Sequence, residues 1–208
     1  MVRTTAPERA DTADKKRKES HHHHEVFSAE KAGQLDTRLR RLLYRPDILA
    51  ERLVKPGDHV LDFGCGPGFF TREFANQVGD GGKVIAVDLQ EGMLRILREK
   101  MEREGLMKRV MIHQCTPDSI GLPPAFDGTV DVACAIFVVH EVPDPTRLFW
   151  EISRLLKPGG LFFYTEPFYV VPGREFREHL KEAENAGFEV VKRHLFFLNR
   201  AAHLRKAV

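Results

Sequence analysis

The stretch VLDFGCGPG, residues 60–68, decides the fold of this chain. It begins as a short apolar run typical of a buried strand, and residues 69–78 continue with the apolar spacing of a helix. Gly64 and Gly66 allow the backbone to turn sharply and to approach a ligand, while Gly68 allows the helix to begin close to the strand. A glycine loop between a strand and a helix therefore predicts a ligand-binding turn.

Two acidic residues refine the prediction of the ligand. Asp88 ends the next apolar run, KVIAVDL, and an acid at that place can accept hydrogen bonds from a ribose diol. Asp62 leads the loop, and Pro67 removes one backbone donor from it. The loop also lacks the Gly-x-x-Gly spacing that admits a dinucleotide pyrophosphate. A ligand with an amine and a ribose is thus favoured, although glycines needed only for packing are the alternative.

The remaining pattern alternates strands with helices, which predicts a doubly wound α/β sheet that is mostly parallel. Further strands are expected at 109–114, 130–139, 161–166, 188–194 and 195–204, and helices at 91–105, 145–156 and 173–186. The last two strands have no helix between them, so they should form a hairpin that places one reversed strand in the sheet.

Composition limits the domain organisation and the partners. The 208 residues suit one domain, and 32 Lys and Arg against 30 Asp and Glu give a net charge of +2, too small to argue for nucleic acid. We expect a tail at 1–25, a helical cap at 26–57 and the main domain at 58–208. No stretch has the apolar length of a membrane span, and no export signal is expected. Three separated cysteines indicate a reduced, cytoplasmic chain, with an oligomeric state that the sequence leaves open.

Four adjacent histidines, His21–His24, are the oddity of the composition. A solvated tail is the preferred interpretation, because metal binding needs a fixed geometry; contact of His23 or His24 with substrate or metal is the minority interpretation. No metal site is therefore expected.

The motifs LDFGCGPG, VIAVDL and LLKPGG together resemble the class I S-adenosylmethionine-dependent methyltransferases, in the small-molecule branch of the ubiquinone/menaquinone type. The resemblance implies a Rossmann-like, seven-stranded sheet with a reversed final hairpin strand. It implies S-adenosylmethionine as cofactor, S-adenosylhomocysteine as product, and a small-molecule methyl acceptor. The cofactor-binding residues expected on this basis are Asp62, Phe63, Gly64, Cys65, Gly66, Gly68, Asp88, Leu89, Thr116 and Ala135.

One position departs from the family pattern. Such enzymes commonly carry an acid after the third strand that bonds the adenine amino group, and Cys115 stands there in HQCTPD. The backbone of Thr116 or the side chain of Asp118 can serve instead, unless the alignment is shifted.

Methyl transfer from a sulfonium is an in-line displacement, so a general base is needed only when the acceptor carries a proton of high pKa. His140 and Glu166 follow the fourth and fifth strands and are the catalytic candidates. A loop-tying histidine and a solvated strand end are the alternatives. Candidate substrate contacts, which can equally be core residues, are Tyr44, Phe137, Phe168 and Tyr169.

The strands enclose no insertion large enough for a substrate domain, which favours a small acceptor over a polymer. Arg40, Arg41 and Arg45 on the N-terminal helix permit an anionic acceptor, or form a solvated face. Two other functions stay open: methylation of RNA or protein with the basic cluster at 15–18 as a docking tail, and a non-catalytic domain that binds the cofactor. Nucleic acid is the less favoured partner, because the tetrad typical of amine methylation after the fourth strand is absent.

Overall fold

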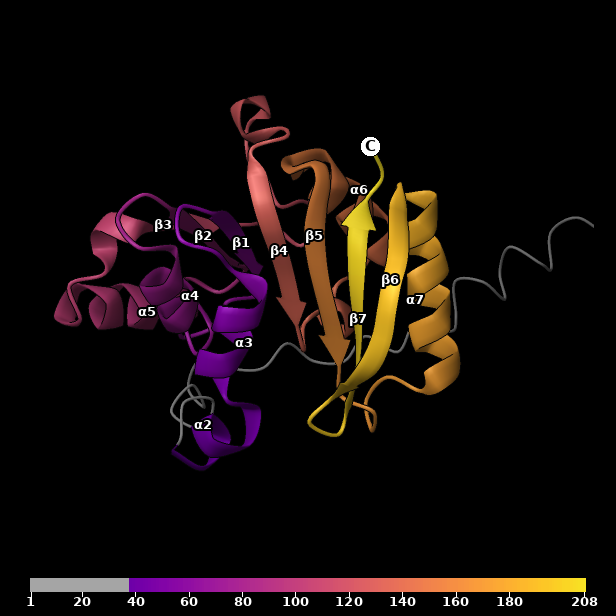
Figure 1. The fold of residues 1–208 in the computed structure, drawn as a ribbon, viewed down its shortest axis with the longest axis horizontal. Coiled ribbons are helices and arrows are strands. Elements are labelled where there is room, and N and C mark those ends of the chain that lie inside the picture. The colour runs from indigo at the N-terminus through magenta and orange to yellow at the C-terminus, as the bar shows by residue number, and fades with distance from the viewer. Residues whose placement is uncertain (1–37) are drawn as a thin grey trace, which may run out of the picture.

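The computed structural model describes residues 38–208, which form one seven-stranded sheet with helices on both faces (Figure 1). The strands are β1 (His59–Phe63), β2 (Lys83–Asp88), β3 (Val110–Gln114), β4 (Val130–Ile136), β5 (Leu156–Glu166), β6 (Phe188–Phe196) and β7 (Asn199–Lys206). Their order across the sheet is β3-β2-β1-β4-β5-β7-β6. Strands β1 to β5 pair in parallel, whereas β7 is antiparallel to both β5 and β6. The expected reversed strand is therefore confirmed.

Helices divide between the two faces of the sheet. They are α2 (Arg38–Tyr44), α3 (Pro46–Leu53), α4 (Thr71–Val78), α5 (Glu91–Arg103), α6 (Pro145–Leu155) and α7 (Gly173–Asn185). One core cluster joins the buried residues of α6 and α7 to alternate residues of the strands, such as Leu61 and Tyr164. A second cluster joins α3, α4 and α5 to the residues that point the other way, such as Val60 and Phe163. The central strands are thus buried on both faces, as parallel strands require.

The strand order indicates at which edge of the sheet a ligand is expected to bind. The chain reverses direction across the sheet between β1 and β4, and ligands of open α/β sheets bind in the crevice at that point, beyond the carboxyl ends of the strands. The short helix α2 lies beyond the same edge (Figure 1). A left-handed residue, Arg45 with φ 42°, separates α2 from α3, and Pro46 opens α3.

The largest errors in the expected strand boundaries are at β4, β5 and β7. Strand β4 ends at Ile136 rather than at 139, because Phe137 takes a positive φ of 62° and Val139–Glu141 form a short 3-10 helix. Strand β5 begins at Leu156, and residues 157–160 form an irregularity between the pairs Val130↔Leu156 and Val132↔Leu161. Strand β7 begins at Asn199 rather than at 195, because the hairpin turns at Phe197, which takes a positive φ of 52° without glycine. The expected tail, the histidine run and the first part of the cap lie outside the described residues.

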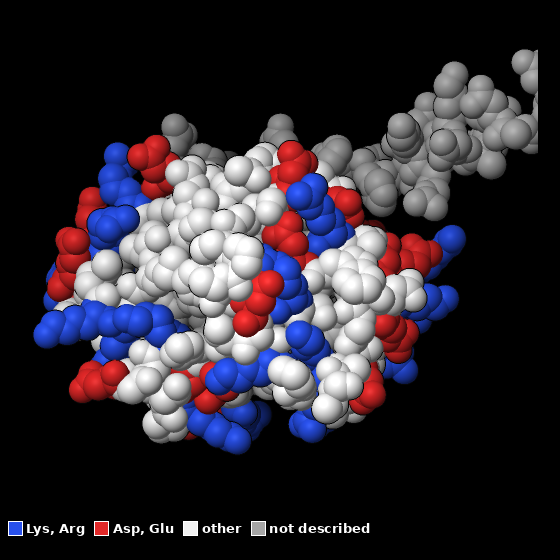
Figure 2. Space-filling model, turned by 90° about the horizontal axis from the view of Figure 1, so that it is seen from above, with Lys and Arg blue, Asp and Glu red and all other residues white. Residues whose placement is uncertain are grey.

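The edge opposite the crevice shows acidic and basic side chains interspersed around a pale central area (Figure 2). No large single-sign patch is visible on this face. None of the helices between residues 38 and 208 has the length and apolar character needed to cross a membrane.

Candidate functional site

A cavity of about 990 Å³ opens at the carboxyl ends of β1 to β4. The glycine loop after β1, the ends of β2 and β3, the segment after β4 and helix α2 all contribute to its wall. Its volume lies at the upper end of the range for small-molecule sites, so a nucleoside-sized ligand and a second small molecule can fit together.

The backbone donors of the glycine loop are already engaged within the protein. Gly64 and Cys65 both donate their N–H groups to the carbonyl of Val87, at 2.8 and 3.0 Å. Gly66 donates to Asp88 Oδ2 at 2.8 Å, and Gly68 donates to the Cys65 carbonyl at 3.1 Å. Since proline has no N–H, no donor between residues 64 and 68 is left for a phosphate. The loop therefore offers no free backbone donor to an anionic ligand.

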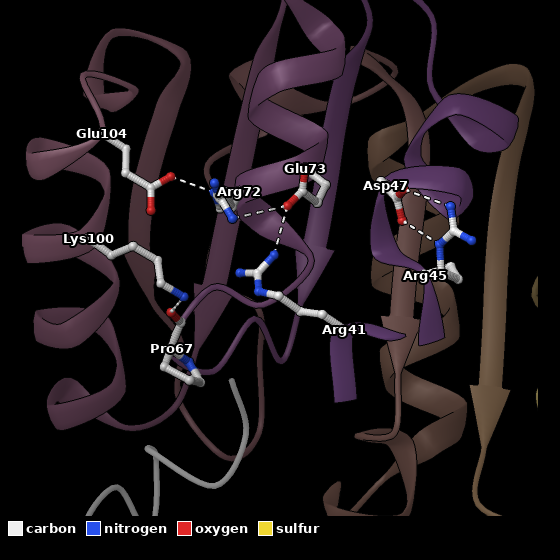
Figure 3. Close-up of polar contacts among 8 residues, drawn as sticks. All are labelled: Arg41, Arg45, Asp47, Pro67, Arg72, Glu73, Lys100 and Glu104. Carbon is white, nitrogen blue, oxygen red and sulfur yellow. Dashed lines mark hydrogen bonds and ion pairs between the residues drawn. The ribbon is translucent and has the colours of Figure 1, made fainter. Parts of the chain in front are cut away.

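Close packing fixes the shape of this loop. A Cβ atom at Gly64 would lie 2.3 Å from Val138 Cγ2, and one at Gly68 would lie 2.4 Å from Leu97 Cδ1. Both glycines take positive φ values, 70° and 82°. From α5, the buried Lys100 donates to the Pro67 carbonyl at 3.1 Å (Figure 3). The loop is thus held from both sides before any ligand binds.

The two acids of the sequence motif have different places. Asp88 lines the cavity, where its carboxylate accepts from Gly66 and from Gln90 N at 2.9 Å. Asp62 does not line it; it is 3% exposed and accepts from Thr71 Oγ1 at 2.6 Å. Burial raises the pKa of Asp62 to about 7 against the opposing effect of the Thr71 hydrogen bond, and the charge of Asp88 adds to the rise. Asp62 thus supports the loop from behind.

Cys115 stands where the resembled family commonly has an acid, and the structure shows which acids lie near it. Cys115 lines the cavity beside Thr116, and burial raises the pKa of its thiol to about 11, so the thiol stays neutral. Glu151 of α6, which the sequence did not single out, also lines the cavity. Its Oε2 accepts from Ser119 Oγ at 3.1 Å and from Ile120 N at 2.7 Å. Acids at this end of the cavity therefore come from helix α6 and also from Asp118, in the segment that follows β3.

His140 and Glu166 form a buried pair. Glu166 is fully buried at the end of β5, and its Oε2 lies 2.6 Å from His140 Nδ1. Its Oε1 accepts the backbone N–H groups of Val139 and His140, at 2.8 and 3.3 Å. Burial lowers the pKa of His140, but the hydrogen bond and charge of Glu166, together with Glu141 and Glu175, raise it overall. His140 lines the cavity, whereas Glu166 does not and lies behind the histidine.

Aromatic side chains join the cap to the segment after β4. Phe137 takes a positive φ of 62°, unusual for a bulky residue, and its ring lies 5.4 Å from that of Tyr44. The Tyr44 ring also lies 5.8 Å from Phe196 and 5.4 Å from Phe197 of the hairpin. Tyr44, Phe137 and Tyr169 line the cavity.

Ion pairs join helix α2 to helix α4 and to the end of helix α5. Arg41 Nη1 lies 2.9 Å from Glu73 Oε1, and Arg72 links Glu73 to Glu104 of α5 (Figure 3). Arg40 extends instead over the ring of Phe69, 4.8 Å from its centroid. Helix α2 is thus tied to both α4 and the glycine loop.

Most of the site residues predicted from sequence meet in this one cavity. Those that line it are Tyr44, Phe63, Gly64, Cys65, Gly66, Asp88, Leu89, Thr116, Phe137, His140 and Tyr169. Those that lie outside its wall are Asp62, Gly68, Ala135, Glu166 and Phe168. Ala135 is fully buried within β4, and Phe168 is exposed beside Tyr169. Phe69 and Phe70, which follow the loop and line the cavity, were missed, although their position beside Gly68 could have indicated them.

Comparison with known proteins gives consistent similarities. Residues 60–160 match the family described as "Methyltransferase domain". A ubiquinone/menaquinone biosynthesis C-methyltransferase of Teredinibacter turnerae is 34% identical over 113 residues, 54% of this chain and 44% of that protein. A demethylmenaquinone methyltransferase of Lactobacillus johnsonii is 35% identical over 117 residues, 56% of this chain and 47% of that protein. The matched segment thus spans less than half the length of these curated relatives.

A solved structure extends the similarity over most of the chain. The crystal structure of a SAM-dependent methyltransferase from Aquifex aeolicus superposes with a TM-score of 0.76 at 29% identity. It covers 86% of this chain and 99% of that protein.

Proposed function

We propose that this chain, whose residues 60–160 match the methyltransferase-domain family, is a class I S-adenosylmethionine-dependent methyltransferase similar to the ubiquinone/menaquinone type and that it methylates a small-molecule acceptor. The observation that carries the proposal is that Asp88, the glycine loop and His140 line one cavity. The proposed cofactor site and the candidate base thereby open into the same cavity.

The residues present fit S-adenosylmethionine. The loop has no N–H left for a phosphate, and Asp88 stands where a ribose diol needs an acceptor. Leu89 offers an apolar surface for adenine, and Glu151 offers a carboxylate near Thr116 for its amino group. When bound, the cofactor supplies an electrophilic methyl group on sulfur.

His140 is proposed to take a proton from the acceptor. Glu166 is a buried carboxylate whose Oε2 lies 2.6 Å from His140 Nδ1, so it accepts a hydrogen bond from Nδ1–H. The proton stays on Nδ1, and Nε2 is then the basic nitrogen. Glu166 is accordingly a positioning residue. Its charge raises the pKa of His140, so the basic form, and with it the activity, should increase as the pH rises through that pKa.

The acceptor proposed here is a planar, hydroxylated aromatic molecule. Tyr44, Phe70, Phe137 and Tyr169 supply aromatic surface to the cavity, which suits a flat ring. The curated relatives are named for C-methylation in ubiquinone and menaquinone biosynthesis, which supports an acceptor of this kind. Removal of a phenolic proton by His140 would make such a ring a better nucleophile.

The proposed domain plan is a cap, to which α2 and α3 belong, over a cofactor-binding domain that starts at residue 58. We also propose a reducing, cytoplasmic location, supported by three cysteines that are free and buried.

Calorimetry with S-adenosylhomocysteine tests the cofactor site. Asp88→Ala should weaken binding by roughly 10- to 100-fold, since each hydrogen bond to a charged group contributes about 1.5–3 kcal/mol. Asp80→Ala, which removes an exposed acid paired with Arg109, is the matched control and should bind normally. Wild-type protein that binds no cofactor, or Asp88→Ala that binds as well as wild type, would overturn the assignment.

Product formation tests the reaction. Purified protein is incubated with S-adenosylmethionine and a panel of hydroxylated aromatic acceptors, and S-adenosylhomocysteine release is measured. Release that depends on the acceptor and falls strongly in His140→Ala supports the proposal. Tight cofactor binding without release across small molecules, RNA and protein would indicate a non-catalytic domain instead.

A further inference from the structure

The turn between β6 and β7 lies at the same edge of the sheet as helix α2 (Figure 1). Its aromatic residues Phe196 and Phe197 contact the ring of Tyr44, which lines the cavity. Neither phenylalanine is itself part of the cavity wall. The hairpin therefore supports one part of that wall from outside.

Arg200, the second residue of β7, joins the hairpin to the segment that follows β5. Its Nη1 donates to the carbonyl oxygens of Phe168 and Val171, at 3.2 and 2.9 Å. Its own carbonyl accepts a hydrogen bond from Thr165 Oγ1 of β5 at 2.9 Å. The guanidinium also packs near the start of α7, since a Cβ atom at Gly173 would lie 3.4 Å from both Nε and Nη2. One side chain thus links β7, the loop after β5 and the first turn of α7.

The loop after β5, residues 167–172, has a fixed base and an exposed tip. At the base, Val171 is fully buried, and its N–H donates to the carbonyl of Pro167 at 2.9 Å. At the tip, Tyr169 is 77% exposed, although it lines the cavity. A residue so exposed has few packing contacts of its own, so the position of Tyr169 depends on the base that Arg200 holds.

We propose that Arg200 is a positioning residue for the methyl acceptor, an inference that rests on the function proposed above. It holds the loop in the conformation that presents Tyr169 to the cavity, while the phenylalanines of the same hairpin support Tyr44. Arginine suits this task because its guanidinium stays charged and its N–H groups can reach two carbonyls at once. Arg200 does not line the cavity, so it acts on the acceptor only through the loop.

The cofactor contacts should be independent of Arg200. Asp88, the proposed ribose contact, ends β2, and the strands β1, β4 and β5 lie between β2 and β7. At roughly 4.8 Å for each strand spacing, β2 and β7 are about 19 Å apart. A change at Arg200 should therefore alter acceptor binding and leave nucleoside binding as it is.

Hydrogen exchange tests the structural step without an activity assay. The variants are Arg200→Met, Arg200→Lys and, as a matched control, Arg205→Met, which removes an exposed arginine of the same strand. In Arg200→Met, the amides between Pro167 and Pro172 should exchange roughly 10-fold faster or more, because two charge-assisted hydrogen bonds are lost. Arg200→Lys should show a smaller increase, and Arg205→Met should match wild type.

Steady-state kinetics test the effect on the acceptor. With S-adenosylmethionine and the hydroxylated aromatic acceptor of fastest turnover, Arg200→Met should raise the KM of the acceptor roughly 10-fold and change kcat less. Arg200→Lys should recover part of the difference, and Arg205→Met should behave as wild type. Calorimetry should show S-adenosylhomocysteine binding to all three variants within about twofold of wild type, as expected for distant sites.

Each contrary result has a distinct meaning. Wild-type protein that fails to bind S-adenosylhomocysteine, or to methylate any acceptor of the panel, contradicts the proposed function itself. Unchanged exchange of the loop in Arg200→Met overturns the role of Arg200 in holding the loop. Faster exchange with an unchanged acceptor KM, or an equal loss of cofactor and acceptor binding, overturns its role in positioning the acceptor.

Tyr169→Ala keeps the proposal testable even where Arg200→Met does not fold. Truncation of so exposed a side chain should leave the stability nearly unchanged. The acceptor KM should still rise in this variant, with normal binding of S-adenosylhomocysteine. An acceptor KM equal to that of wild type would also overturn the proposal.

Discussion

The substitution Gly64→Ala, which adds one methyl group, tests how closely the glycine loop is packed. In Gly64→Ala, the new Cβ would meet Val138 at 2.3 Å from Cγ2 and 2.6 Å from Cβ, with φ fixed near 70°. The left-handed backbone costs an alanine about 1–2 kcal/mol, and overpacking costs about 1–3 kcal/mol more. We therefore expect unfolding in urea to show a loss of about 2–5 kcal/mol, and S-adenosylhomocysteine binding to weaken because the loop must shift.

A control and a second substitution separate the two costs. Gly57 also has a positive φ, 90°, but nothing lies within 4 Å of a Cβ there, so Gly57→Ala should lose only the backbone share, about 1–2 kcal/mol. Val138→Ala removes two of the three close atoms and should recover part of the difference in the double variant. A Gly64→Ala variant no less stable than Gly57→Ala would refute this reasoning.

Three further substitutions probe the surrounding groups. Glu166→Gln should place an amide donor against His140 Nδ1 and move the imidazole proton to Nε2, which ¹⁵N NMR can detect; an unchanged tautomer would contradict the proposed pair. Asp62 has a pKa raised from 3.8 to about 7, so its stabilising, protonated form is lost as the pH rises through 7. Asp62→Asn should therefore abolish roughly 2–3 kcal/mol of the stability loss between pH 5 and 8, measured by urea unfolding. Lys100→Met should cost about 1–3 kcal/mol and weaken nucleoside binding, because the Pro67 carbonyl loses its donor; normal binding would exclude Lys100 from loop positioning.

The local sequence pattern was sufficient to predict strand β1 and the glycine loop that follows it. The run HVLDF coincides with β1, and the glycines that follow it occupy the positive-φ positions that a side chain cannot easily take. The hairpin was less readable, because its turn at Phe197 uses an aromatic residue in a left-handed conformation. An apolar run that continues through such a turn gives no sign of where one strand ends.

In the candidate site, too, the sequence predicted some features and missed others. The sequence predicts acids at the strand ends near the crevice, but it cannot tell which way each carboxylate side chain turns. Asp88 faces the cavity, whereas Asp62 and Glu166 turn inward to Thr71 and His140. Those directions depend on contacts between residues far apart in the chain. The cavity-facing Glu151 was missed for the same reason, since it looks like an ordinary charge on a helix.

The complete internal hydrogen bonding of the glycine loop bears on how substrate and product compete. A loop that is already formed requires little ordering when a nucleoside binds, with or without the methyl group. S-adenosylmethionine and S-adenosylhomocysteine differ by one methyl group and by the positive charge that it places on sulfur, and no donor of the loop is available to detect either. Any preference for substrate over product would then come from the acidic side chains of the cavity wall rather than from the loop.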